Sequence, residues 1–471
     1  MVSEDYEFCR KGLLGKKFFS EAGRAINFYN LYFIVNPSAN PKGWLIKTPQ
    51  NISILHNNVC SWYLVSKNGE EFDEGLEKAL KGNLFKKIKM RVKKSRTKIV
   101  TKLKEVNYEK ISDKMLAKLV LDYYKTYAGF CQLPAGCRVV DRGIRRVMDE
   151  ETIRVVSVPK ELTYAAREHL QLLKLASEVK ANKLNKNVIT IRLNSILKKY
   201  CYFGCGYFNE PPRTFAEYES ILEKHVNDNP IVEYNAFLAK FNSDLEERNR
   251  LLSKLDPNER KIAVLASEIV ALKDYSKVSY GEIIFHAIKL FEEISKRTNK
   301  SSFFLKQLLP WEIVNLLLKK ENFGGEILKR ANKSVMFGNS KKTVILIGNE
   351  VDLLKKKFFS VSLKKNLNGR VASKGIAAGK VCVVLSPKDF RKMKKGNILV
   401  VKNTNPDYLF LMKLAGAIVA EEGGLTSHVS VTSRELGVPC IVGIEDVTKI
   451  LKDGAYVEVD ANKGIIKSIK N

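Results

Sequence analysis

One stretch of the sequence reads Glu421-Glu-Gly-Gly-Leu-Thr-Ser-His-Val-Ser-Val-Thr-Ser-Arg-Glu-Leu-Gly-Val-Pro-Cys-Ile-Val-Gly443. An apolar strand is expected just before it, at Ala417–Ala420, and a short helical pattern begins at about His428. Gly437 and Pro439 end that helix, because glycine accepts the left-handed C-terminal conformation and proline cannot continue the hydrogen-bond ladder. The last residues of the stretch predict another buried strand. The histidine is therefore expected at a strand-to-helix junction.

The loop before this helix is suited to an anion, because free amide N–H groups and the positive end of the helix dipole meet there. Gly423 and Gly424 let a phosphate approach the backbone closely, since no side chain stands in the way. A histidine at this place, His428, can act as a nucleophile, and its phosphorylated form finds its charge compensated. A simpler interpretation also stays open: Thr426 and Ser427 cap the helix, and the histidine packs at its start.

The motif resembles a known domain. Gly424-Leu-Thr-Ser-His428 followed by Arg434-Glu-Leu-Gly-Val-Pro439 is similar to the swivelling phosphohistidine domain of phosphoenolpyruvate synthase, pyruvate phosphate dikinase and rifampicin phosphotransferase. The resemblance continues in Gly369–Val384, which matches the way that domain begins, and in Asn405-Pro-Asp-Tyr408, which matches the segment before its histidine. It covers roughly residues 367 to 471.

The resemblance implies that His428 is the phosphate-carrying residue. It places Thr426 where some dikinases have a threonine that is a regulatory phosphorylation site. One departure is Val429-Ser430, where the family usually has two alanines; the side chains are small or moderate, so the role of the histidine is unaffected. Short apolar strands alternate with helices and glycine turns here, which predicts an α/β domain. The expected strands are 381–385, 398–401, 417–419, 441–442 and 455–459.

The whole chain has 471 residues, so two to four domains are expected. We expect a mainly α-helical N-terminal region followed by a compact α/β swivelling phosphohistidine domain. The expected parts are a mixed α/β segment at 1–70, a helical acceptor-binding or docking domain at 71–354, a linker at 355–366 and the phosphohistidine domain at 367–471. The helical part loosely resembles the middle domain of rifampicin phosphotransferases.

Several local features of the first 366 residues bear on structure. A helix is expected over Phe8–Phe33, a loop at Leu133–Gly136, and a helix over Phe215–His225 capped by Thr214. The basic run Lys86–Lys98 has two interpretations, an electrostatic patch for nucleic acid or phosphate and the solvated face of a long amphipathic helix. We favour the second, because no aromatic residues interleave as a base-stacking platform requires.

The chain carries 81 basic and 51 acidic residues, a net charge of +30. Such an excess attracts nucleic acid, anionic membrane or phosphorylated small molecules, and it equally suits docking on an acidic protein. Arg142, Arg145 and Arg146 are candidates to grip a phosphate or an acceptor through bidentate bonds. Surface salt bridges are the simpler explanation of these arginines.

The eight cysteines are scattered, and no second pair or histidine stands near Cys201 and Cys205 at zinc-finger spacing. We therefore expect reduced thiols and no metal site. Met1-Val-Ser-Glu-Asp5 is acidic where a signal peptide has a basic start, and no run reaches the ~18 apolar residues of a membrane span. The protein is expected in the cytoplasm, without a membrane partner.

The sequence contains no Walker-type phosphate loop. Residues 70–366 are too helical for an ATP-grasp fold, and they lack the strand–helix series of the barrel that handles phosphoenolpyruvate. We therefore expect no cofactor bound by this chain, and ATP and Mg²⁺ used through a separate ATP-grasp-type subunit. Phenylphosphate synthase, whose modules are on separate chains, resembles this arrangement.

The function that these observations favour is a phosphotransferase component. His428 would carry a phosphoryl group from an ATP- or phosphoenolpyruvate-using module, supplied in trans, to an unidentified small-molecule acceptor. Two alternatives stay open. One is a non-enzymatic phosphorelay or regulatory protein, and the other is a basic nucleic-acid-associated protein that uses the domain as a scaffold.

Overall fold

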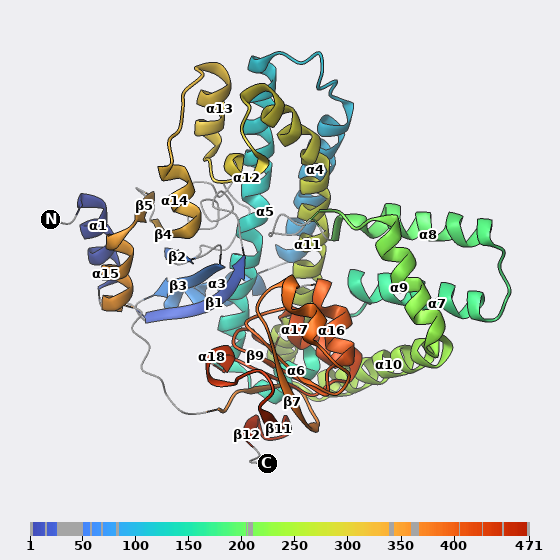
Figure 1. The fold of residues 1–471 in the computed structure, drawn as a ribbon. Helices are drawn as coiled ribbons and strands as arrows, with labels where there is room; N and C mark the ends of the chain where they lie inside the picture. The colour runs from blue at the N-terminus through green and yellow to red at the C-terminus, as the bar shows by residue number, and fades with distance from the viewer. Residues whose placement is uncertain are drawn as a thin grey trace. The chain divides into compact units, whose positions relative to one another are not determined.

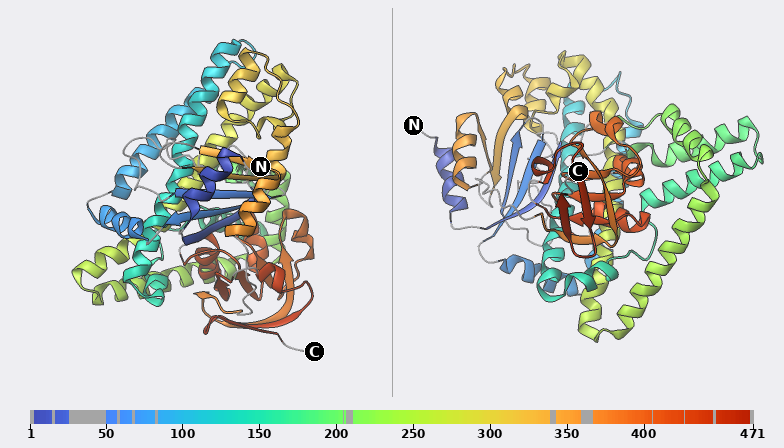
Figure 2. Two further views of the ribbon diagram at one scale, coloured as in Figure 1. Left: turned by 90° about the vertical axis from the view of Figure 1, so that its left-hand side faces the viewer. Right: turned by 60° about the horizontal axis from the view of Figure 1, so that its bottom comes forward.

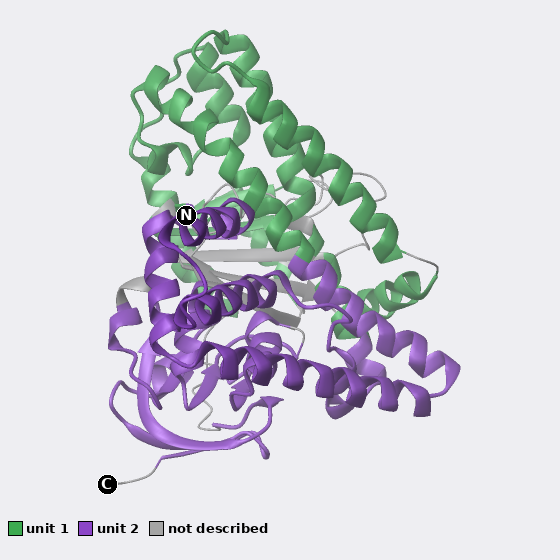
Figure 3. Cartoon of the chain, turned by 90° about the vertical axis from the view of Figure 1, so that its right-hand side faces the viewer, with its two compact units in different colours: residues 1–143, 205–211, 275–362 green, residues 144–204, 212–274, 363–471 purple. Residues whose placement is uncertain are grey.

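The structure is a computed structural model, and Figure 1 shows its helices and strands along the chain. It describes residues 3–14, 17–25, 50–56, 59–66, 69–81, 84–203, 205, 211–338, 343–358, 367–404, 406–425, 427–444 and 447–468. The chain divides into two compact units, each assembled from segments far apart in the sequence (Figure 3). Unit 1 combines residues 1–143, 205–211 and 275–362, and unit 2 combines residues 144–204, 212–274 and 363–471.

Unit 1 contains an antiparallel sheet whose described strands have the order β1-β3-β2-β4-β5. The strands are β1 (Lys17–Ala25), β2 (Gln50–His56), β3 (Val59–Ser66), β4 (Lys333–Gly338) and β5 (Thr343–Ile347). In Figure 1, β4 lies beside β2, although most of the chain separates them in sequence. The mixed N-terminal segment is therefore completed by strands from far along the chain.

Unit 1 also contains a set of helices. They are α1 (Glu4–Leu13), α3 (Glu70–Leu80), α4 (Leu84–Glu105), most of α5 (Asp113–Val147), the second part of α11 (Pro257–Thr298), α12 (Ser302–Leu305), α13 (Pro310–Leu318), α14 (Glu326–Asn332) and α15 (Asn349–Phe358). One core joins α1 and α15 to β4 and β5, and Cys9, Val335 and Val351 are fully buried in it. Helix α15 occupies the start of the expected linker, and residues 359–366 lie outside the described part.

The expectation of a helix over Phe8–Phe33 is wrong within the described residues. Helix α1 ends at Leu13, and β1 begins at Lys17. Strand β1 pairs with β3 from Lys17 to Ala25, with a register shift between Ser20 and Ala22, and a partner so distant in sequence leaves no local signal. Residues 26–33 lie outside the described part of the chain.

The loop expected at Leu133–Gly136 is also absent, because α5 continues through it. Leu133, Cys137, Val140 and Ile144 are buried and recur at helical spacing. Burial of this stripe outweighs the ~3 kcal/mol that an interior proline costs a helix. By contrast, the cap predicted at Thr214 is confirmed: its side chain and that of Glu217 form a capping box.

Unit 2 begins with a group of helices. They are α6 (Glu150–Val156), α7 (Tyr164–Lys180), α8 (Lys186–Tyr200), α9 (Phe215–Asn227), α10 (Pro230–Lys254) and the first part of α11. Helices α7, α8 and α9 share a core in which Leu172, Leu193 and Tyr218 are buried. The predicted helical region is thus confirmed, and it contributes to both units.

The rest of unit 2 is a mixed sheet, whose strands are coloured orange to dark red in Figure 2. Its described strands have the order β12-β11-β7-β8-β9-β10-β6. The strands are β6 (Arg370–Ser373), β7 (Ile376–Val384), β8 (Ile398–Val401), β9 (Ala417–Ala420), β10 (Cys440–Val442), β11 (Tyr456–Asp460) and β12 (Ile465–Ser468). Strands β7 to β10 are parallel, and the outer pairs are antiparallel. The predicted strands and the α/β class of this part are confirmed.

Short helices and 3₁₀ turns connect β7 to β8, β8 to β9, β9 to β10 and β10 to β11. They are α16 (Leu409–Leu414), α17 (His428–Leu436), α18 (Val447–Ile450) and the 3₁₀ turns η3 (Pro387–Lys392) and η4 (Pro406–Tyr408). Every residue of β8 and β9 is buried, as a continuous apolar run in a parallel sheet predicts. Among the described residues, no helix combines the length and the apolar character that a membrane span requires.

Candidate functional site

The site begins where β9 ends and α17 starts. Helix α17 opens at His428, directly after its N-cap residue Ser427, whose hydroxyl accepts from the Ser430 N–H at 3.4 Å. The helix ends at Gly437, which has φ +67° in the left-handed region. The strand-to-helix junction predicted from sequence is therefore present, with the histidine in the first turn. N–H groups of a first turn have no acceptor within their own helix, so they favour an anion nearby.

The imidazole of His428 is half-buried between two threonine hydroxyls. Thr404 Oγ1 lies 3.0 Å from Nδ1, and Thr432 Oγ1 lies 3.4 Å from Nε2. Both threonines are almost fully buried. The shorter contact is an ordinary hydrogen bond, whereas the longer one is at the limit of a useful one. This geometry fixes the Nδ1 edge of the ring more firmly than the Nε2 edge.

Sequence reasoning missed both threonines. Thr432 follows the histidine by four residues, so helical spacing alone puts it on the same face as His428. Thr404 lies in the loop after β8 and immediately precedes the Asn405-Pro-Asp-Tyr408 motif. The motif marked this segment, but only the parallel pairing of β8 with β9 shows that its loop reaches the histidine.

The two glycines of the loop have different roles. Gly423 has φ +133°, and a Cβ placed on it would come within 2.8 Å of Ser427 Oγ. Its carbonyl accepts from Arg370 at 3.1 Å. The Gly424 carbonyl accepts from the Ser427 N–H and from the Ser430 hydroxyl, both at 2.8 Å. The loop is thus held by its own backbone, while Thr426 lies outside the described residues.

A buried arginine of α17 holds the loop through hydrogen bonds to its backbone. Arg434 is 6% exposed, and both of its terminal nitrogens donate to the Leu425 carbonyl at 3.0 Å. It also donates to the Ala372 carbonyl at 3.3 Å and to the Ser157 hydroxyl at 3.1 Å. Burial, helped by the nearby Arg154 charge, lowers the pKa of Arg434 to about 10. From the sequence, this arginine stands out only as part of the Arg434–Pro439 motif.

The three arginines proposed from sequence lie near the end of α5. Arg142 belongs to unit 1, where its guanidinium stands 5.8 Å from the Phe72 ring centroid. Arg146 is exposed, and Arg145 lies 3.9 Å from a Glu150 oxygen. Glu150 in turn lies 3.9 Å from Arg370 Nε, the arginine that donates to Gly423. Arg145 thus reaches the loop through two intervening side chains, and a direct role in binding stays a prediction.

Comparison with known proteins identifies the domain that carries this loop. The family model described as "PEP-utilising enzyme, mobile domain" matches residues 393–464, which include β8, β9, α17 and the whole histidine loop. Residues 393–464 are a PEP-utilising enzyme mobile domain. The resemblance stated from the sequence is therefore confirmed, and we call these residues the mobile domain.

Known relatives match this part of the chain. Phosphoenolpyruvate synthase from Pyrococcus furiosus is 51% identical over 100 residues, which are 21% of this chain and 12% of that protein. A probable phosphoenolpyruvate synthase from Archaeoglobus fulgidus is 53% identical over 100 residues, 21% of this chain and 13% of that protein. Pyruvate kinase 2 from Synechocystis is 37% identical over 124 residues, 26% of this chain and 20% of that protein. The chain thus spans only about an eighth of the first two relatives.

Among solved structures, aconitase X from Thermococcus kodakaraensis in its holo form covers 22% of this chain and 97% of its own, with 21% identity. The TM-score is 0.18, a value that does not establish a shared fold.

One short segment of the mobile domain, η4 together with α16, contacts helices of the same unit. Asp407 lies 3.3 Å from Arg213, which also pairs with the buried Glu168 at 2.9 Å. Three residues on, the Phe410 ring lies 3.2 Å from the Lys224 ammonium nitrogen. These contacts join the segment to α7 and α9.

After another three residues, Lys413 donates to Glu233 of α10 at 2.7 Å and lies 3.1 Å from His169 of α7. Burial and the Lys413 charge lower the pKa of His169 to about 4, against the opposing effect of Glu233. Contacts at three successive helical spacings show that one face of this segment is engaged by α7, α9 and α10. We call this set of contacts the helical seat.

Proposed function

We propose that this chain is the phosphoryl-carrying component of a phosphotransferase. The observation that carries the proposal is the position of His428, at the first turn of α17 with Thr404 bonded to one ring nitrogen. A phosphoryl group on the other nitrogen would meet the positive end of the helix. The mobile-domain match supports the same assignment.

The chemistry consists of two in-line displacements. If Nδ1–H donates to Thr404 Oγ1, Nε2 carries the lone pair that attacks the phosphorus of the donor. A P–N bond forms while the P–O bond to the leaving group breaks. In the second step an acceptor oxygen attacks the same phosphorus and the P–N bond breaks, which restores the neutral imidazole.

We propose that a separate partner protein binds the phosphoryl donor. A separate ATP-grasp-type subunit would bind ATP and Mg²⁺ and would phosphorylate His428, and a phosphoenolpyruvate-using partner is the variant of this scheme. The helical region at 71–354 would bind the small-molecule acceptor or dock the partner. The parts of this scheme act in the cytoplasm, where ATP is available.

The test is a two-step transfer assay with the full chain. The chain is incubated with a candidate ATP-grasp partner, Mg²⁺ and γ- or β-labelled ATP, and the labelled protein is then freed of nucleotide. We expect label on the wild type and none on His428→Ala, followed by loss of label when an extract of small molecules is added. Label that no small molecule removes favours the phosphorelay alternative, and equal labelling of His428→Ala refutes the carrier role.

A further inference from the structure

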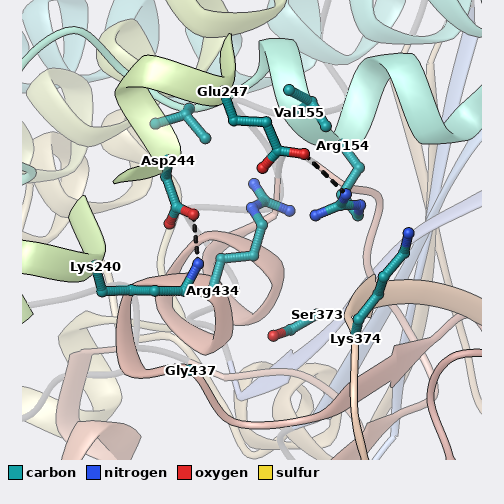
Figure 4. Close-up of a pocket in the computed structure, with 10 residues that line it drawn as sticks. Arg154, Val155, Lys240, Asp244, Glu247, Ser373, Lys374, Arg434 and Gly437 are labelled. Atoms are coloured by element: carbon teal, nitrogen blue, oxygen red, sulfur yellow. Dashed lines mark hydrogen bonds and ion pairs between the residues drawn. The ribbon is translucent and has the colours of Figure 1, made fainter. Parts of the chain in front are cut away.

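A cleft lies in unit 2 away from the histidine, at the other end of α17. Its volume is about 140 Å³, and it is lined by Arg154, Val155, Val158, Lys240, Asp244, Glu247, Ser373, Lys374, Arg434 and Gly437 (Figure 4). One wall comes from α6 and α10, and the other comes from β6, the residue after it and the end of α17. At ~30 Å³ per water molecule, this space holds roughly four or five waters or one small ligand.

The charges around the cleft favour an anion. The cleft is lined by four cationic side chains and two carboxylates. Asp244 forms an ion pair with Lys240, and Glu247 lies 3.9 Å from Arg154 (Figure 4). Each of the two carboxylates therefore has a cationic partner. Glu151, just behind the wall, pairs with Arg154 and Lys374 at 2.7 and 2.8 Å. Counting it as well, the site keeps a surplus of positive charge.

The excess positive charge includes Arg434, whose side chain is buried. Among the described ion pairs, none gives Arg434 a carboxylate within 4 Å, and its guanidinium donates to two carbonyls and a hydroxyl. Its guanidinium points from α17 toward Arg154 and the acids of α10 (Figure 4). A buried charge that has no carboxylate within 4 Å is costly, and the Arg154 guanidinium nearby adds to that cost against the favourable effect of the Asp244 and Glu435 carboxyls. An anion in the adjoining cleft offsets both costs.

We propose that this cleft is a binding site for a small oxyanion of the phosphate class, either free inorganic phosphate or the phosphate group of a small phosphomonoester. Arg154 and Lys374 supply charge-assisted donors at the open side, Ser373 supplies a hydroxyl, and Arg434 supplies the buried charge. The walls belong to both the mobile domain and the helices, so a bound anion stabilises their contact. The site does not depend on phosphorylation of His428.

Calorimetric titration of the full chain with inorganic phosphate tests the site, with ionic strength held constant by KCl. We expect saturable binding to the wild type and to His428→Ala. Arg154→Gln and Lys374→Gln each remove one charged donor, so each should weaken binding about tenfold. The matched control is Lys183→Gln, an exposed lysine of the same unit outside the cleft, which should change the affinity by less than about twofold.

The outcomes separate the alternatives. The Lys374 side chain is 53% exposed, so its variant keeps the test valid if Arg154→Gln fails to fold. Equal binding of glycerol phosphate shows that the site takes a phosphomonoester, and binding of inorganic phosphate alone identifies the free ion. Absence of saturation at about 20 mM phosphate, or the same affinity in wild type and both cleft variants, overturns the proposal. Normal phosphorylation of His428 with no phosphate binding leaves the proposed function intact and refutes this site alone.

Discussion

At the scale of single residues, the arrangement around His428 is a set of backbone and hydroxyl contacts that orient one ring. Thr404 holds Nδ1, Ser427 caps the helix, and Arg434 holds the Leu425 carbonyl. The Thr404 contact and the place of His428 in the first turn of α17 thus orient the imidazole.

Replacing Thr404 by valine should slow phosphorylation of His428 about fivefold, without unfolding the domain. The hydroxyl that fixes the Nδ1–H tautomer is lost, and a single hydrogen bond contributes about 1 kcal/mol. The measurement is the single-turnover rate of labelling by the partner and ATP. Thr404→Ser keeps the hydroxyl and serves as the control. A rate unchanged in the valine variant would show that Thr404 only packs.

Replacing Gly423 by alanine should lower the free energy of unfolding by more than about 1 kcal/mol, because φ is +133° and the new Cβ meets Ser427 Oγ at 2.8 Å. The matched control is Gly324→Ala, where a Cβ has nothing within 4 Å. Urea unfolding compares both with the wild type. Equal stability of the two variants would mean that the loop relaxes without strain.

At the scale of elements, local patterns predicted structure wherever an element is determined by its own residues. The parallel strands β8 and β9, the start of α17 and the cap at Thr214 all follow from apolar runs and cap chemistry. Sequence failed at β1, whose partner strand is distant, and in α5, where burial outweighs the proline signal. For the same reason it missed Thr404, which reaches the histidine only through the pairing of two strands.

Protonation of the histidines in and beside the helical seat should lower the free energy of unfolding in mild acid. Burial lowers the pKa of His169 to about 4 and that of His225 to about 3, while unfolded histidines titrate near 6.5. The unfolded state therefore binds more protons between pH 6.5 and 4, so stability falls as the pH falls through this range. The pKa of Glu233 is lowered by its His169 and Lys413 partners despite burial, which adds a loss in the same direction at lower pH.

His169→Gln should remove its share of this pH dependence. Between pH 7 and pH 5 the variant should lose about 2 kcal/mol less unfolding free energy than the wild type. Urea unfolding at the two pH values measures the difference. Phe237→Leu, whose ring lies 5.7 Å from that of His169, is the control for lost packing and should lower stability similarly at both pH values. A wild-type pH dependence in His169→Gln would show that another group titrates.

At the scale of the whole molecule, the sequence indicated the mobile domain but not the assembly of the units. Strands β4 and β5 complete a sheet begun near the N-terminus, and the helical region is divided between both units. No local pattern encodes such long-range assembly. The helical seat also has a consequence for the proposed cycle, because a carrier that visits a partner must leave Glu233 and Arg213.

A reversible cross-link across the seat should therefore block the cycle. The double variant Glu233→Cys with Lys413→Cys is cross-linked by a cleavable reagent that carries two thiol-reactive groups, which replaces the ion pair by a covalent tether. We expect phosphorylation of His428 by the partner to fall at least about tenfold and to recover after cleavage. The chain with either cysteine alone, treated identically, is the control. Full labelling of the cross-linked chain would show that the partner can phosphorylate His428 while the contacts of the helical seat stay in place.

The central claim is that His428 carries a phosphoryl group, and direct mapping of the modification tests it. The chain is purified with its co-encoded partners, supplied with ATP and Mg²⁺, and digested at alkaline pH for mass spectrometry. The account predicts a phosphate on residue 428 that survives base and is lost in acid. Acid-stable phosphate elsewhere, with residue 428 unmodified under conditions in which the partner consumes ATP, would contradict it.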